Sequence, residues 1–321
     1  MKLRCQLAGV LGACVVALAP AGGWAATRVT RARGVNARTG RATPPFAELV
    51  KAARKNDRAA LERLAGRFGV ARLGEGARSA DAAIAQAALE TVPFARGGVL
   101  LAGVVADRLD AGDAPVAIAA ARTLGALFEG DVPSVLAEWE VPADVVTRAC
   151  GGLRALAARA DAASSARLAA LDALAVAQTT CTPLPDVAAL LRDPAPEVRR
   201  AAALVLPAGD PRAVSALRAG LADPDPGVSA ACAASVCRRV EPARGHAPGD
   251  ALVAQATMTA RALVAAPATR PEDAVEMLAC VSAAGTASDR ALLERLRGGA
   301  ASPVRDRAAE LLGVAAPGKT E

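Results

Sequence analysis

The stretch DPAPEVRRAAAL, residues 193–204, returns 30 positions later as DPDPGVSAAC, residues 223–232. Each copy joins a proline-rich turn to an alanine-rich segment whose apolar residues have helical spacing. A fixed period of this length is typical of proteins built from stacked structural repeats. The sequence therefore predicts an array of units, each made of a helix, an Asp-Pro turn and a second helix.

Four segments align on a valine near the start of the second helix. Small or aliphatic residues recur four, five and eight positions after it, which places them along one helical face. The preceding proline is tolerated because the N–H it lacks has no partner in a first helical turn. Asp193 and Asp223 are placed to accept hydrogen bonds from free N–H groups of the turn. The aligned pairs are Pro196 with Val198, Pro226 with Val228, Pro303 with Val304, and Pro115 with Val116.

This pattern resembles the HEAT repeat, in the short form also found in phycobilisome-lyase-type proteins. The residues that carry the resemblance are Asp193, Pro194, Val198, Asp223, Pro224, Val228, Pro303 and Val304. The resemblance implies an all-α fold, a right-handed α-solenoid of stacked antiparallel helix pairs. It also implies a ladder of Arg and Asp between repeats. That ladder is incomplete here, because Ser229 and Ala117 stand where the first copy has Arg199.

The composition agrees with a helical array. Of 321 residues, 53% are hydrophobic and 2% aromatic, and tyrosine is missing. Strands favour β-branched and aromatic residues, so this core suits close-packed helices better than a β-sandwich or barrel. The formal net charge of +6 is mild for this length, and we expect no nucleic-acid partner.

The N-terminal residues 1–25 have the three-part layout of a secretory signal peptide. A basic start precedes an apolar run that is shorter than the ~20 residues of a membrane span, and small residues lead to a cleavage site after Ala25. We therefore expect export to the periplasm or envelope, with no transmembrane span in the mature chain. The run Leu-Gly-Ala-Cys ending at Cys14 leaves open a lipid anchor on that cysteine.

The rest of the chain divides into three parts. Residues 26–45 carry five arginines and no acidic residue, and they predict a disordered arm, either a solvated linker or a contact with an anionic surface. Residues 46–316 predict the HEAT-like solenoid. Within it, Pro185 to Leu191 predicts a helix, and Gly151-Gly152 predicts a kink or break. Residues 317–321 form a tail.

Residues that could support catalysis are scarce. His246, the single histidine, lies in a Pro/Gly-rich loop without a partner nearby in sequence, so we expect no catalytic residue. No motif for a metal or cofactor is present, and we expect neither. A disulfide between Cys150 and Cys181 would join neighbouring helix pairs in an oxidising compartment. Cys232 replaces an alanine of the repeat and is expected in the core.

These observations favour a non-catalytic scaffold that binds a protein or peptide partner. The resemblance implies that second helices line its binding surface. The expected partner contacts are Arg199, Arg200, Arg238, Arg239 and Trp139; the arginines are equally compatible with a solvated outer face. The alternative is an accessory, lyase-like protein that acts on another protein or its chromophore.

Overall fold

The computed structural model describes residues 45–129, 132–181, 185–206, 211–238, 240, 251–266 and 269–313, all within the unit Thr43–Glu321. The expected signal peptide (1–25), nearly all of the arm (26–45), Cys14, Arg239, His246 and the tail (317–321) lie outside these residues. The described residues are helical or in turns, which confirms the all-α prediction.

The helices form two layers, because the chain alternates between a first and a second helix of each pair. The first layer contains α2 (Arg58–Ala77), α4 (Ala102–Ala106) with the short 3-10 helices η1 (Val92–Phe94) and η2 (Gly98–Leu101), α7 (Ala143–Ala158), η3 (Pro185–Arg192), α10 (Pro211–Gly220), α12 (Ala251–Leu263) and α14 (Ala287–Arg297). The second layer contains α1 (Phe46–Arg54), α3 (Ala82–Thr91), α5 (Ala114–Leu127), α8 (Ser164–Val176), α9 (Pro196–Val205), α11 (Pro226–Cys237), α13 (Pro271–Ala284) and α15 (Pro303–Leu311). A short helix, α6 (Val132–Glu138), lies in the connection between α5 and α7.

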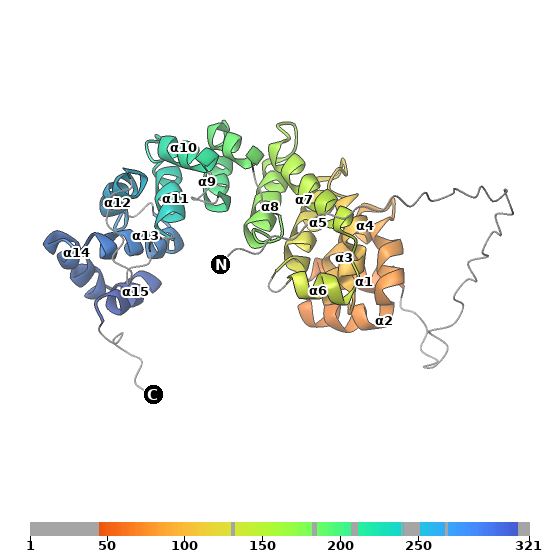
Figure 1. Cartoon of the computed structure of the whole chain (residues 1–321). Helices are drawn as coiled ribbons and strands as arrows, with labels where there is room; N and C mark the ends of the chain where they lie inside the picture. The colour runs from red at the N-terminus through yellow and green to blue at the C-terminus, as the bar shows by residue number, and fades with distance from the viewer. Residues whose placement is uncertain are drawn as a thin grey trace, which may run out of the picture. The chain divides into compact units, whose positions relative to one another are not determined.

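Each helix of the second layer packs against the next one along the chain, from α1 to α15. The same order can be followed by colour in Figure 1. First-layer helices contact one another in the same way from α2 to α12. Because each unit buries its apolar face against its neighbours, this is the stacked helix-pair architecture of a HEAT-like array, as the sequence predicted.

The aligned repeat positions form the core between the layers. The valines at 116, 198 and 228 are completely buried, whereas Val304 of the last helix is partly exposed. The residues four and five positions later are buried in all four helices, and they are Ala120, Ala121, Ala202, Ala203, Cys232, Ala233, Ala308 and Ala309. Small side chains at these positions let neighbouring helices approach closely.

Two buried hydroxyls tie successive second-layer helices together. Thr123 of α5 donates to the Leu89 carbonyl at the end of α3 over 2.8 Å. Ser235 of α11 donates to the Leu206 carbonyl at the end of α9 over 3.1 Å. Both hydroxyls stand seven positions after the repeat valine, so the same position of the repeat donates to a carbonyl at the end of the preceding second-layer helix.

One local expectation was wrong. α7 runs through Gly151-Gly152 without a break, and a Cβ on Gly152 would meet a Leu109 side-chain carbon at 2.7 Å. Glycine at 152 therefore serves close packing rather than a kink. The segment from Pro185 is helical, as the sequence predicted, and takes the form of a 3-10 helix.

Candidate functional site

Two of the expected partner contacts, Arg199 and Arg200, form ion pairs with aspartates of the array itself. The Arg199 guanidinium donates to both carboxylate oxygens of Asp223 at 2.9 and 3.0 Å, and its side chain is 14% exposed. Arg200 donates to Asp273 of α13 at 2.8 Å. Because both guanidinium groups are held in intramolecular ion pairs, they are unsuited to the role of free partner contacts that the sequence suggested.

The first of these pairs belongs to a ladder between repeats. One unit earlier, Arg167 of α8 pairs with Asp193, and the two side chains are only 6% and 7% exposed. Each aspartate also accepts from the backbone N–H two positions on, at Ala195 and Asp225. The aspartates thus fix the turn and the next repeat together.

The ladder stops where the sequence predicted, at Ser229. This hydroxyl donates to the Asp223 carbonyl over 2.9 Å, as the Arg199 guanidinium does to the Asp193 carbonyl. Serine thus keeps the contact within the turn and loses the contact to the next repeat. The ladder starts one unit earlier than the sequence pattern indicated. The pattern missed Arg167 because Ala166 replaces the valine that precedes the arginine in the later unit.

Arg200 makes a longer connection. Asp273 lies 73 positions away, on α13, and α11 packs against both α9 and α13. The Arg200 side chain passes near Gly227, where an added Cβ would lie 3.9 Å from it. Asp273 is 3% exposed and takes the third position of α13, where α9 and α11 have the repeat valine. Burying a carboxylate is costly without a charge partner, and Arg200 supplies one here.

The side of the second layer that the first layer leaves uncovered forms a distinct surface. The positions two and six residues after the repeat valine share this side, since they are four residues apart on a helix. We call it the second-helix face and define it by Ile118, Arg122, Leu168, Asp172, Val176 and Leu204. Arg200 lies on the same side, but Asp273 holds its guanidinium. Val176 is 48% exposed and the other aliphatic members are partly exposed.

Charges of both signs occur on this face. Asp172 of α8 is solvent-accessible, yet the protein around it partly desolvates the carboxylate and raises its pKa. The positive charges of Arg122, Arg200 and Arg270 act in the opposite direction, and burial outweighs them. The face thus combines aliphatic side chains with an acid surrounded by arginines from α5, α9 and the start of α13.

The two remaining expected contacts that the structure describes are Trp139 and Arg238. Trp139 is partly buried, and its ring covers Gly97, where an added Cβ would lie 3.0 Å from a ring carbon. It therefore fills a gap next to the connection between α5 and α7. Arg238 is exposed at the C-terminal end of α11.

The cysteines form one expected and one unexpected pair. Cys150 of α7 is bonded to Cys181, just after α8, and Cys237 of α11 is bonded to Cys280 of α13. No sequence signal pointed to the second pair, because its partners are separated by 43 residues and lie in different repeats. Cys232 is a buried free thiol whose pKa is raised to about 12, by burial first and then by Asp223. At neutral pH it is therefore a small core residue and not a nucleophile.

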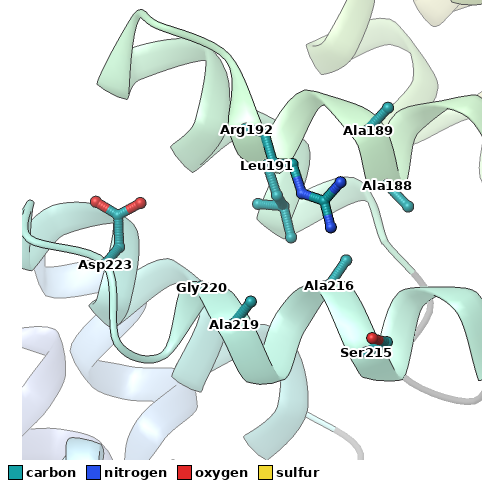
Figure 2. Close-up of a pocket in the computed structure, with 9 residues that line it drawn as sticks. All are labelled: Ala188, Ala189, Leu191, Arg192, Ser215, Ala216, Ala219, Gly220 and Asp223. Carbon is teal, nitrogen blue, oxygen red and sulfur yellow. The ribbon is translucent and has the colours of Figure 1, made fainter.

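A groove of about 260 Å³ separates η3 from α10 in the first layer. Figure 2 shows its walls of alanine and glycine and the Arg192 guanidinium extending across it toward α10. Asp223 at its rim is already paired with Arg199. A ligand site normally brings several polar groups together, so this groove is better described as the place where two repeats meet.

Within the described part of the chain, no three His, Cys, Asp or Glu side chains are grouped so that they could hold a metal ion. The same residues contain no helix that is long and apolar enough to span a membrane.

No protein-family model matches the sequence, and no curated protein matches it. Among solved structures, the chain is similar to the complex of CpcE and CpcF of phycocyanin lyase from Nostoc sp. PCC7120. The sequences are 16% identical, the TM-score is 0.36, and the alignment covers 86% of this chain and 96% of that chain. A likeness this distant carries no functional argument.

Proposed function

We propose that the chain is a non-catalytic scaffold that is exported to the cell envelope and binds a protein or peptide partner along its second-helix face. The observation that carries this proposal is the composition of that face. Partly exposed aliphatic side chains from α5, α8 and α9 lie beside charges of both signs, a mixture that is typical of protein interfaces. Stacked repeats present such surfaces without any catalytic group.

The charge pattern favours protein over nucleic acid. Asp172 lies among the three arginines that act on it. A protein segment can place a basic side chain against this carboxylate and acidic ones against the arginines, whereas a phosphate backbone offers negative charge alone.

The disulfides support export. Cytosolic thiols are kept reduced, and structural disulfides are typical of oxidising compartments such as the periplasm. Two pairs within one chain, Cys150–Cys181 and Cys237–Cys280, agree with the signal-peptide layout of residues 1–25. Intact mass of the protein from the cell envelope tests this part. We expect a chain that starts at Ala26 and loses two hydrogens per bridge on oxidation, and a chain starting at Met1 contradicts it.

Site-specific photocrosslinking tests the binding face. A benzophenone amino acid at Val176 of α8 is compared with one at Met258 of α12, a first-layer residue that is 62% exposed. We expect a discrete protein adduct from position 176 and none from position 258. Arg122→Glu should reduce the adduct, whereas Arg295→Glu on the exposed surface of α14 should leave it unchanged. Equal adducts from both positions contradict the proposal.

The lyase-like accessory role rests on the sequence resemblance alone. Visible absorbance in the purified protein or in the crosslinked adduct would favour it over a passive scaffold.

A further inference from the structure

A larger open groove, with a volume of about 540 Å³, lies between α1 and α3 at the N-terminal end of the second layer. Apolar side chains from both helices line it, together with three basic residues and one acidic residue. The lining residues are Ala47, Val50, Lys51, Arg54, Lys55, Asp81, Ala83 and Ile84.

The three basic groups, Lys51, Arg54 and Lys55, are exposed, and none of them forms an ion pair among the described residues. The carboxylate of Asp81 accepts hydrogen bonds from the N–H groups of Ala83 and Ile84 at 2.9 and 3.2 Å, so it caps α3. The rim of the groove therefore has a net positive charge.

In the part of the chain that the structure describes, the acids on the adjoining elements form no ion pair with the basic residues of this rim. Glu48 of α1 is paired with Arg67 of α2 at 3.5 Å. Asp57 accepts from the Ala60 N–H at 2.9 Å and caps α2. The three basic side chains of the rim are thus available to form charge-assisted hydrogen bonds with a ligand.

We infer that the groove between α1 and α3 binds a short acidic segment of a protein partner that also carries aliphatic side chains. Val50 and Ile84 supply the apolar surface for the aliphatic side chains, and Lys51, Arg54 and Lys55 receive the carboxylates. α1 has nine residues, so the groove beside it is roughly 13 Å long and accommodates about four residues of extended chain.

The shape of the groove distinguishes this partner from other anionic ones. A bilayer surface is flat and cannot enter a groove between two helices, whereas a peptide side chain can. Single-stranded nucleic acid usually stacks its bases on aromatic side chains, and the lining contains none. An acidic and aliphatic peptide satisfies both the charge and the apolar surface.

This inference rests on the proposed partner-binding role, but it concerns different residues. If the Val176 crosslink forms and the groove fails its own test, only the groove assignment is lost. If the Val176 crosslink fails, the proposed function is lost, whatever the groove binds.

Fluorescence anisotropy with the full mature chain tests the groove. The probe is a labelled eight-residue peptide of alternating leucine and glutamate, compared with one of serine and glutamate and one of leucine and lysine. We expect saturable binding of the first peptide alone. The triple change Lys51→Glu, Arg54→Glu and Lys55→Glu should weaken it by about tenfold or more, because each reversal replaces attraction with repulsion.

A matched variant controls for overall charge. Arg63→Glu, Arg96→Glu and Arg295→Glu reverse three exposed arginines outside the groove, and the peptide should bind as it does to the unchanged chain. Equal weakening in this control, equal binding of the serine–glutamate peptide, or no peptide binding would overturn the inference. So would binding to phosphatidylglycerol vesicles, lost in the groove variant, without binding of the peptide.

Discussion

Two regions of the described chain, residues 46–139 and residues 143–313, share one two-layer architecture. Different interactions stabilise the two regions. The four phenylalanines of the chain and Trp139 all lie in the first region, which we call the aromatic region. Phe46 and Phe68 pack with ring centroids 5.3 Å apart, and Phe128 is completely buried. The ion pairs there, such as Arg67–Glu48, are exposed.

The second region, which we call the ladder region, contains no aromatic residue. It has both disulfides and the most buried ion pairs, including Arg167–Asp193, Arg199–Asp223 and Arg200–Asp273. Alanine-rich helices offer little apolar area per residue. A helix-pair array can thus replace aromatic core side chains with cross-links and buried charges, and thereby gain sensitivity to redox state and pH.

Removing both disulfides should have the largest effect. Changing Cys150, Cys181, Cys237 and Cys280 to alanine should lower the free energy of unfolding by about 2–4 kcal/mol per bridge. The reason is that each bridge closes a long loop in the unfolded chain. Repeat arrays respond locally. Hydrogen exchange should therefore accelerate in peptides from the ladder region and change little in residues 46–139.

Cys232→Ala is the matched control, since this cysteine is buried in the same region but unbonded. It should cost about 1 kcal/mol and respond to no reductant. Faster exchange of equal size in the aromatic region would show that the two regions do not differ as described.

Asp193→Ala should have the next largest effect. It should lower the free energy of unfolding by about 3–5 kcal/mol, because it leaves the buried Arg167 guanidinium without its charge partner. The control is Asp110→Ala, which removes one of the two acidic partners of Arg159 and should lower the free energy of unfolding by about 0–1 kcal/mol, since Asp110 is 81% exposed. Urea denaturation of both variants measures the difference. The double change Arg167→Met with Asp193→Ala should recover part of the loss.

The same pair gives the array its acid sensitivity. Burial raises the pKa of Asp193, but the hydrogen bonds from Arg167 and from the Ala195 N–H outweigh it, and the pKa is lowered overall. A lowered carboxyl pKa contributes stability above the unfolded value of about 3.9 that is lost as the pH falls through the folded value. The difference between Asp193→Ala and the unchanged chain should therefore shrink below about pH 4. A difference that is constant with pH would contradict the ladder's role.

The sequence predicted the architecture because the repeat valine and the small residues after it recur with helical spacing. It predicted the end of the ladder at Ser229, because the sequence has serine there in place of arginine. It missed Arg167, where alanine replaces the valine that marks the position. It also missed Arg200–Asp273 and Cys237–Cys280, because these contacts depend on how units stack in space.

The candidate surfaces were less accessible to sequence reasoning for the same reason. Arg199 and Arg200 stand out as exposed arginines on a helical wheel, yet aspartates from other units pair with them. The groove between α1 and α3 joins two helices that are separated in sequence by the whole of α2. Its basic residues were visible in the sequence, but their position around an apolar groove was not.

Phe128→Leu should have a smaller effect, confined to the aromatic region. The ring is completely buried, and its replacement by a smaller apolar side chain should cost about 1–1.5 kcal/mol. Phe94→Leu is the control, because Phe94 is only partly buried and should lose less than half of that. Hydrogen exchange should rise in residues 46–139 to the same extent with and without reductant. Dependence on reductant would mean that the disulfides also support this region.

The smallest expected effect has the opposite sign. Burial raises the pKa of Asp172 against the pull of Arg122, Arg200 and Arg270. A raised carboxyl pKa means that the ionised form opposes folding above that pKa and that the cost disappears as the pH falls through it. Because solvent screens this exposed carboxylate, Asp172→Asn should stabilise the chain by only a few tenths of a kcal/mol at pH 7 and by less near pH 4. The same change should weaken the Val176 crosslink, since Asp172 lies one helical turn before that position on the second-helix face. If instead Asp172→Asn destabilises the chain, the three arginines make this carboxylate a structural ion-pair partner, and the mixed charges of the face would belong to the fold and not to recognition.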